Sequence, residues 1–334
     1  MYLPEGNILL TGATGFLGFR VLERLVENSF SGNIIAAGRV LKPRARLEAG
    51  NVHYRLGDLS DAFFTEQLFE EFPITHIINC AALSSPWGQY EAFFRANVLS
   101  QKHLIRLAEK HAVKRFVHIS TPSLYFDYRN RLDIKESDPL PRKFVNHYAA
   151  TKREAEILLE KSSLDWVALR PRALVGRGDT VIMPRVIRAY DEGKLRIIGN
   201  GENFVDITPV SNVVDAVVLS LTAPEKACGK QYNIANGAPV KLWAMLAGVL
   251  QRLDRHLPEK KVPLAIAMTA ATLMETAAKW TPGHREPALT RYSVGTIGLS
   301  FSMDISLAQK YLGYSPQQSV KEAMDEFVEW YKNG

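Results

Sequence analysis

A glycine-rich turn between the first apolar run and the first helical pattern constrains this chain most. The apolar run Asn7–Thr11 has the character of a buried strand, and residues 15–28 carry apolar side chains at helical spacing. Between them, Gly12 permits a tight turn, Gly15 lets backbone N–H groups approach a ligand, and Gly18 allows close helix–strand packing. Because a helix N-terminus favours anions, the turn predicts a pyrophosphate cradle. Its expected members are Gly12, Thr14, Gly15, Phe16, Leu17 and Gly18.

Strand and helix patterns alternate through the first half of the chain. The expected strands are rich in Val, Ile and Leu with little alternation, which is typical of a parallel sheet covered by helices on both faces. This order predicts a doubly wound α/β fold. The expected strands are residues 7–11, 33–37, 52–55, 76–80 and 115–120, and the expected helices are 15–28, 61–71, 90–111 and 148–161.

The alternation of strand and helix patterns becomes irregular after about residue 170, where proline and glycine are frequent. We expect a dinucleotide-binding domain over residues 1–170 and a smaller, mainly substrate-binding lobe over 171–334, with some segments returning to the first sheet. Closing helices are expected at 302–314 and 319–332. With 46% hydrophobic and 23% charged residues among 334, the chain is neither mainly disordered nor collagen-like.

The charged residues and cysteines limit the partners and the compartment. A net charge of +6 over this length is mild, so we expect no nucleic-acid partner. Cys80 and Cys228 form no pair at metal or redox spacing, and the eight histidines show no zinc spacing, so no metal is expected. Free thiols and the absence of a leader pattern favour a cytoplasmic location.

The end of the second expected strand bears on the choice of cofactor. NAD-binding proteins usually place Asp or Glu there to bond the ribose 2′-hydroxyl. Here the strand ends at Arg39, and Lys42, Arg44 and Arg46 follow. Guanidinium groups suit a 2′-phosphate, so NADP(H) is expected and NAD(H) stays open. Asp58 is a candidate contact for the adenine amino group or an exposed loop carboxylate.

A tyrosine and a lysine lie four residues apart, at Tyr148 and Lys152. On a helix this spacing puts both side chains on one face. A nearby cation lowers the pKa of a phenol, and such a tyrosine can exchange a proton with a carbinol while hydride moves to or from nicotinamide. The fifth strand ends in hydroxyl residues, Ser120, Thr121 and Ser123, at the sheet edge where ligands bind in open α/β folds.

These motifs resemble the extended short-chain dehydrogenases/reductases, and the likeness covers essentially the whole chain. It rests on TGATGFLG (11–18), GDLSD (57–61), NCAA (79–82), ANV (96–98), HISTPS (118–123), YAATK (148–152) and LRPRALVGRGD (169–179). The resemblance implies a Rossmann fold with Thr121, Tyr148, Lys152 and Asn97 as catalytic residues. Further cofactor contacts would come from Asp58, Leu59, Ala81, Ala82, Tyr148, Lys152 and Pro171, and substrate contacts from Trp87, Ser123 and Arg172.

Finer features resemble the 3β-hydroxysteroid dehydrogenase-like branch. They are PWG (86–88), VDIT (205–208), YNIANG (232–237) and LTRY (289–292), and within the branch bacterial 2-alkyl-3-oxoalkanoate reductases and sterol dehydrogenases are most similar. Many members have Ser-Ser where this chain has Ser120-Thr121, so either hydroxyl is a candidate for the working one. Pro209 stands where an aromatic residue is often found, which bears on the pocket.

An uncharged run, Val262–Met274, has 13 residues and is too short to span a bilayer. Two interpretations stay open, a packed core helix or a helix that lines an acyl channel and touches a membrane surface through residues 262–280.

Three functions are compatible with these features. The first is an NADP(H)-dependent oxidoreductase that interconverts a ketone and a secondary alcohol on an apolar 3-oxo acyl or sterol-like substrate, with a homodimer left open. The second is a nucleotide-sugar epimerase or dehydratase, although Pro122-Ser123 stand where sugar dehydratases tend to carry Asp-Glu. The third is a non-enzymatic dinucleotide sensor, which often loses the tyrosine or the lysine; both are present here.

Overall fold

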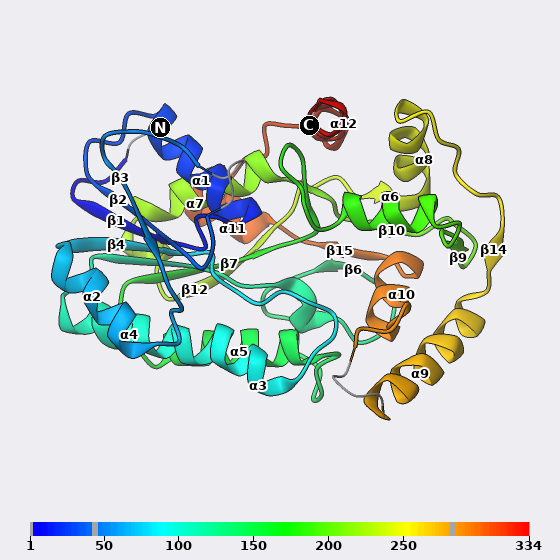
Figure 1. Ribbon diagram of the computed structural model, residues 1–334, viewed down its shortest axis with the longest axis horizontal. Helices are drawn as coiled ribbons and strands as arrows, with labels where there is room; N and C mark the ends of the chain where they lie inside the picture. Colours follow the sequence, from blue (N-terminus) through cyan, green and yellow to red (C-terminus); the bar gives the residue numbers. More distant parts are fainter. Residues whose placement is uncertain (1–2, 42–45, 281–284, 334) are drawn as a thin grey trace.

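A seven-stranded parallel sheet forms the centre of the protein in a computed structural model that describes residues 3–41, 46–280 and 285–333 (Figure 1). The strand order is β12-β7-β5-β4-β1-β2-β3. The strands are β1 (Asn7–Thr11), β2 (Ile34–Gly38), β3 (Val52–Leu56), β4 (Ile74–Asn79), β5 (Arg115–Ile119), β7 (Trp166–Pro171) and β12 (Lys230–Ile234). The order reverses direction at β1, next to β4, which places the glycine turn at the topological switch point where open α/β sheets bind ligands.

Helices cover both faces of this sheet (Figure 1). One face carries α1 (Phe16–Glu27), α7 (Val210–Leu221) and α11 (Ser306–Leu312), and the other carries α2 (Ala62–Glu71), α3 (Tyr90–Phe93), α4 (Ser100–Lys110) and α5 (His147–Glu160). Most positions of β1, β2, β4, β5 and β7 are buried, as strands between two helical layers must be. The doubly wound α/β class expected from the sequence is confirmed.

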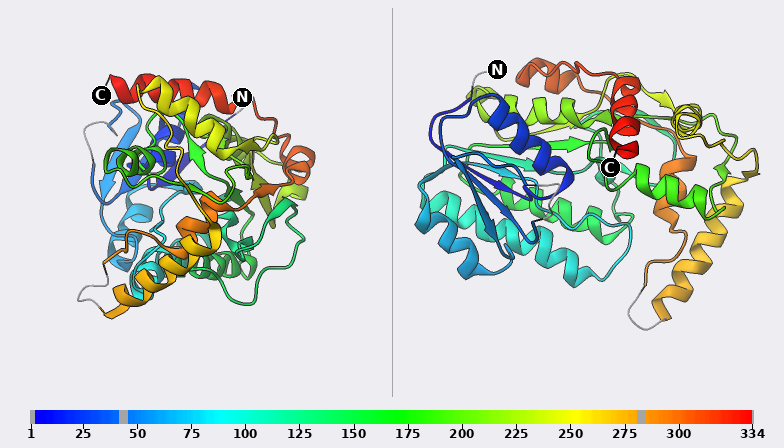
Figure 2. Two further views of the ribbon diagram at one scale, coloured as in Figure 1. Left: turned by 90° about the vertical axis from the view of Figure 1, so that its right-hand side faces the viewer. Right: turned by 45° about the horizontal axis from the view of Figure 1, so that its top comes forward.

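Several segments beyond β7, together with the earlier strand β6, build a second lobe beside the carboxyl ends of the strands (Figures 1 and 2). Its helices are α6 (Met183–Asp191), α8 (Leu242–Arg252), α9 (Leu264–Trp280), α10 (Arg291–Gly298) and α12 (Val320–Lys332). A four-stranded sheet in the order β13-β10-β15-β6 joins them to the centre; its strands are β6 (Arg131–Ile134), β10 (Phe204–Val205), β13 (Val240–Lys241) and β15 (Phe301–Met303). Two strand pairs complete the lobe, β8 (Leu174–Val175) with β11 (Thr208–Pro209) and β9 (Ile197–Ile198) with β14 (Lys261–Val262).

The chain between residues 302 and 314 differs from the expected single helix. Residues 301–303 form β15, which pairs with β6 and β10, and the helix α11 begins only at Ser306. Ser302 accepts a hydrogen bond at Oγ from the backbone N–H of Asp133 at 2.9 Å, and Phe301 and Met303 are buried in the core. Pairing with strands distant in sequence therefore overrides the local helical pattern here.

The long helix expected over residues 90–111 forms with one irregularity. Between α3 and α4 the chain makes a π-helical segment, η2 (Phe94–Leu99), and the helix ends at Lys110. Such wide turns commonly occur at functional sites, and this one carries Asn97.

The uncharged run at 262–274 contains both a strand and a helix. Val262 belongs to β14, and α9 runs from Leu264 to Trp280. Large apolar side chains of α9 are exposed, so it is not a core helix throughout. Among the described residues, no helix is both long and apolar enough to cross a bilayer.

Candidate active site

The glycine turn has the geometry of a phosphate cradle. Gly12 has a φ of +66°, and a Cβ there would lie 2.8 Å from the backbone N of Ala81. A Cβ on Gly18 would lie 2.1 Å from the Gly12 carbonyl oxygen, so neither position accepts a side chain without moving backbone. Gly15 is the N-cap of α1 and offers no side-chain cap, and the first turn of α1 has no acidic residue. The first N–H groups of that helix are thus available to an anion, and the turn fits a dinucleotide pyrophosphate.

The other expected members of the cradle surround this turn. Thr14 packs against Gly38, where a Cβ would lie 2.5 Å from the Thr14 Oγ1. Phe16 and Leu17 occupy the first turn of α1 and are half-buried; Phe16 lies beside Gly178 and Leu17 packs on the core. Contacts from the end of β1 fix the loop opposite, because Thr11 Oγ1 donates to Asn79 Oδ1 at 2.5 Å and accepts from the Ala81 N–H at 3.3 Å.

The residues expected to select the cofactor lie beyond β2 and β3. Arg39 is exposed directly after β2, and its positive charge acts on the carboxylate of Asp58. Burial alone would raise the pKa of Asp58, but hydrogen bonds from Ser60 and the charges of Arg39 and Arg95 lower it overall, so this carboxylate is ionised. Arg46 pairs with Glu48 at 3.1 Å. Lys42 and Arg44 lie outside the described residues, and Leu59 is buried next to Asp58.

Tyr148 lies on the first turn of α5 with its hydroxyl between two others. The hydroxyls of Ser84, in the loop after β4, and Thr121, directly after β5, both hydrogen-bond to it. Burial is the largest influence on Tyr148 and raises its pKa above the ordinary value of 10.0, more than these hydrogen bonds lower it. The expectation that Lys152 lowers the pKa of Tyr148 is therefore wrong for the protein alone. A protonated phenol suits a proton donor.

Lys152 lies one turn further along α5 and is buried at 1% exposure. Its Nζ lies 3.1 Å from His118 Nε2 and donates to the carbonyl oxygen of Ile119. Burial lowers the pKa of this amine to about 8, against a smaller opposing effect from Glu156. Burial also lowers the pKa of His118 well below its usual value, so the imidazole is neutral and can accept from the ammonium.

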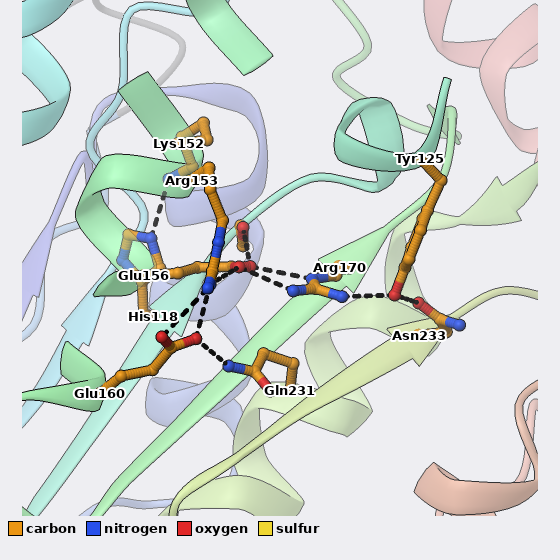
Figure 3. Close-up of polar contacts among 10 residues, drawn as sticks. His118, Tyr125, Lys152, Arg153, Glu156, Glu160, Arg170, Gln231 and Asn233 are labelled. Atoms are coloured by element: carbon orange, nitrogen blue, oxygen red, sulfur yellow. Dashed lines mark hydrogen bonds and ion pairs between the residues drawn. The ribbon is translucent and has the colours of Figure 1, made fainter. Parts of the chain in front are cut away.

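A buried ion pair supports the helix that carries Tyr148 and Lys152 (Figure 3). Arg170 of β7 donates from Nε and Nη2 to the two carboxylate oxygens of Glu156 at 2.8 and 2.7 Å. Ser120 donates to Glu156 Oε1 at 2.5 Å, and Arg170 also donates to the Tyr125 hydroxyl. Burial favours the neutral acid, but Arg170, Ser120 and Arg153 together outweigh it and keep the pKa of Glu156 below its usual value. The pair ties α5 to the central sheet.

These contacts separate the two candidate hydroxyls. Ser120 faces Glu156 on one side of the chain, while Thr121 faces Tyr148 on the other. Successive residues of an extended strand point to opposite sides, which is the physical reason for the division. Only Thr121 is brought to the tyrosine.

Asn97 lies behind the site on the π-helical segment and is buried at 3% exposure. Its side chain accepts from the Leu83 N–H at 2.8 Å and donates to the Leu83 carbonyl at 3.2 Å and to Thr151 Oγ1 at 3.0 Å. The amide thereby connects the loop that carries Ser84 to α5, and we describe it as a positioning residue.

Two of the expected substrate residues, Ser123 and Arg172, contact Tyr292 on α10, to which the sequence motifs assign no role. Thr121 Oγ1 donates to Ser123 Oγ at 3.0 Å, and the Ser123 and Tyr292 hydroxyls lie 2.7 Å apart. Tyr292 also hydrogen-bonds to the buried guanidinium of Arg172, which stacks 4.5 Å from the centre of the Phe301 ring. A hydrogen-bonded chain thus runs from Tyr148 to Arg172. Tyr292 stands in the LTRY run, which was the one available indication.

The remaining expected residues have less specific places. Trp87 is half-buried in the loop after β4, where Ser85 contacts its backbone. In the same loop Ala81 is half-buried and Ala82 is exposed, and Pro171 is buried at the end of β7. Within the described ranges, no group of three or more His, Cys, Asp or Glu side chains has the arrangement of a metal site.

A glycine turn at the switch point, with a tyrosine, a lysine and hydroxyls at the carboxyl edge of the same sheet, defines a dinucleotide-binding α/β protein of the dehydrogenase type. The NAD dependent epimerase/dehydratase family model matches residues 8–235. The chain belongs to this family, the extended short-chain dehydrogenases/reductases, which confirms the resemblance found in the sequence.

Individual relatives extend over nearly the whole chain. The 2-alkyl-3-oxoalkanoate reductase of Shewanella oneidensis is 31% identical, covering 95% of this chain and 84% of the relative. The 3beta-hydroxysteroid-dehydrogenase/decarboxylase isoform 1 of Arabidopsis thaliana is 32% identical over 96% of this chain and 79% of the relative. The UDP-glucuronic acid 4-epimerase of Bacillus cereus, solved in complex with NAD, superposes with a TM-score of 0.74 at 19% identity, over 98% of this chain and 99% of that one, which shows a shared fold.

Proposed function

We propose that the protein is an NADP(H)-dependent reductase that interconverts a ketone and a secondary alcohol on an apolar substrate. The observation that carries the proposal is the Tyr148 hydroxyl, hydrogen-bonded to Thr121 on the same sheet edge as the glycine turn. A bound nicotinamide supplies or accepts the hydride in this chemistry. The protein supplies the proton: Tyr148 donates it to the developing alkoxide, and Thr121 holds the same oxygen by a hydrogen bond.

The hydrogen-bonded hydroxyls around Tyr148 favour the reaction in the direction of ketone reduction. Because burial raises the pKa of Tyr148, the phenol carries its proton before reaction. After it donates, the hydrogen bond from Ser84 stabilises the phenolate that remains. Ser123, Tyr292 and Arg172 continue the chain towards a buried cation, which favours negative charge at its other end.

Lys152 and Arg39 would hold the two ends of the dinucleotide. The buried Lys152 ammonium, one helical turn from Tyr148 and 3.1 Å from His118 Nε2, would bind ribose hydroxyls, and Arg39, whose charge acts on Asp58, would bind a 2′-phosphate. Both assignments are part of the proposal. The printed names of the two relatives, an oxoalkanoate reductase and a hydroxysteroid dehydrogenase, support an apolar substrate.

Turnover of a small panel of substrates tests the proposal. NADPH oxidation is followed with a 2-alkyl-3-oxoalkanoate, a 3-oxosteroid and an unbranched ketone, and interconversion of UDP-sugars is followed by chromatography. We expect NADPH-dependent reduction of at least one apolar ketone and no change in the sugars. Epimerisation of a UDP-sugar without net NADPH oxidation would overturn the proposal and favour the epimerase alternative.

A further inference from the structure

Helix α9 buries three alanines and packs Leu264 and Met268 on the core, but it leaves three other large apolar side chains mostly exposed. Its buried residues are Ala267, Ala271 and Ala278. By contrast, Ile266 is 61% exposed, Leu273 is 67% exposed and Trp280 is 86% exposed. A surface helix of a globular protein normally turns its large apolar residues to the core, so the three exposed ones need an explanation.

The three exposed side chains form one continuous ridge. Ile266, Leu273 and Trp280 are seven residues apart, which is close to two turns of a helix, so successive members deviate by only about 20° around the axis. The ridge is about 21 Å long from the rise of 1.5 Å per residue. It faces away from the alanines that contact the rest of the lobe. In Figure 2, α9 lies along the outer edge of the second lobe, away from the central sheet.

The charges on and beside α9 are mostly positive, and Glu259, next to Lys260, is the exposed acid before the helix. The single acidic residue of α9, Glu275, is half-buried and accepts a hydrogen bond from the backbone N–H of Arg291 at 2.7 Å, so it is directed to α10. Exposed lysines stand at both ends of the helix, Lys260 and Lys261 before it and Lys279 within its last turn. The ridge is apolar, lysines lie at both of its ends, and no acidic side chain of α9 points outward. Such a ridge is complementary to a surface with an apolar interior and an anionic outer layer.

We propose that α9 binds the surface of an anionic lipid bilayer, lying in the interface with Ile266 and Leu273 among the acyl chains and Trp280 at the level of the headgroups. Helices that lie in the interface combine an apolar face with cationic flanks. Tryptophan favours the headgroup level, where its ring is partly apolar and its N–H is solvated. Each lysine near an anionic surface strengthens binding about five-fold.

A second copy of the chain is the competing occupant, and the size of the surface favours the bilayer. A stable protein interface uses about 20–30 residues on each side. Helix α9 has ten exposed residues: Ala265, Ile266, Thr269, Thr272, Leu273, Met274, Thr276, Ala277, Lys279 and Trp280.

The position of α9 connects the lipid surface to the candidate site. Helix α9 packs on α10, and α10 carries Tyr292, whose hydroxyl lies 2.7 Å from that of Ser123. The ridge is therefore one helix away from the hydroxyls beside Tyr148. If α9 binds the bilayer, the second lobe lies at the membrane surface. Long apolar molecules dissolve in that membrane.

Co-sedimentation of the full-length protein with vesicles tests this inference. Vesicles of phosphatidylcholine mixed with phosphatidylglycerol are compared with pure phosphatidylcholine vesicles and with no lipid. We expect sedimentation with the mixed vesicles, and a loss of at least ten-fold in partitioning for the triple variant Ile266→Ser, Leu273→Ser, Trp280→Ser. The matched control Leu56→Ser, Phe63→Ser, Leu132→Ser removes three side chains that are 50%, 68% and 56% exposed elsewhere, and should sediment like wild type.

Charge and oligomeric state are separated by two further measurements. Lys260→Gln with Lys279→Gln should reduce the preference for phosphatidylglycerol about 25-fold while leaving the residual binding to phosphatidylcholine unchanged. Sedimentation velocity of wild type and of the triple variant without lipid reports on self-association. Equal vesicle binding by wild type and triple variant, or a triple variant whose only change is a dissociated dimer, would overturn the inference. Binding is measured without turnover, so this result stands apart from the proposed reductase activity.

Discussion

The hydroxyl of Tyr292 lies 2.7 Å from that of Ser123, although the two residues are 169 positions apart in the chain. This contact joins α10 of the second lobe to the loop that follows β5 in the central sheet. Through Ser123 it reaches Thr121 and then Tyr148. The second lobe therefore contributes a polar group to the candidate site as well as apolar surface.

Replacing Tyr292 by Phe should lower kcat about ten-fold, because the chain of hydroxyls is broken and Arg172 loses a hydrogen-bond acceptor. Affinity for the dinucleotide should be unchanged, since the glycine turn is untouched. The matched control is Tyr128→Phe, because both tyrosine rings pack on Phe126, at 5.4 Å for Tyr128 and 5.8 Å for Tyr292. Steady-state kinetics and dinucleotide titration distinguish the two variants. An equal loss in both would assign Tyr292 a packing role only.

Tyr148→Phe should lower the rate by about 10²–10⁴, the usual contribution of a general acid or base. Fluorescence titration should show dinucleotide affinity within a few-fold of wild type. The neighbouring variant His147→Gln is the control, since the His147 ring packs at 5.6 Å on Tyr90 and at 6.4 Å on Phe93. A fully active Tyr148→Phe protein would remove the proton-transfer mechanism.

Arg39→Asp should invert the preference between the two dinucleotides. The wild-type guanidinium is expected to bind a 2′-phosphate, whereas a carboxylate repels it and accepts from the ribose 2′-hydroxyl. Dissociation constants for NADPH and NADH are measured for both proteins by titration. Arg46→Gln is a suitable control, since Arg46 is paired with Glu48. Wild-type affinity for NADH equal to or above that for NADPH would contradict this interpretation of the strand end.

Dinucleotide affinity should fall as pH rises through the pKa of Lys152. Burial lowers that pKa to about 8, so the amine is charged below pH 8 and loses its proton above it. If the ammonium binds the ribose, the dissociation constant should increase about ten-fold between roughly pH 7 and 9. Lys152→Met should bind weakly and show no such dependence. A wild-type profile that stays flat across this range would separate Lys152 from cofactor binding.

Arg170→Met should destabilise the protein by about 3–5 kcal/mol, because the buried carboxylate of Glu156 loses its two-point partner and keeps, among cations, only the 3.2 Å contact with Arg153. The double variant Arg170→Met, Glu156→Leu should recover much of this loss, since no unpaired charge remains. Urea denaturation gives both free energies of unfolding. The exposed pair Arg55–Glu71 serves as reference, and Arg55→Met should cost at most about 1 kcal/mol. A double variant no more stable than the single one would show that the pair contributes net stability.

Much of the site could be predicted because its determinants are local. A strand, a glycine turn and a helix that adjoin in sequence adjoin in space, and residues four apart on a helix share a face, so the cradle and the Tyr148/Lys152 pair were visible as patterns. The electrostatic expectation failed at the same place. The pKa of Tyr148 depends on burial by surrounding segments, which spacing along α5 does not report.

The sequence by itself determined the strand–turn–helix unit, the order of alternating elements and the family, because each follows from short-range periodicity or from a run of adjacent residues. Tertiary structure alone decided that Thr121 and not Ser120 faces Tyr148, that Tyr292 completes the chain of hydroxyls, and that α9 presents Leu273 outward. Each of these depends on which distant surface a side chain meets. Local patterns give the periodicity of an element, but its buried face and its partners are set by contacts between segments far apart in the chain.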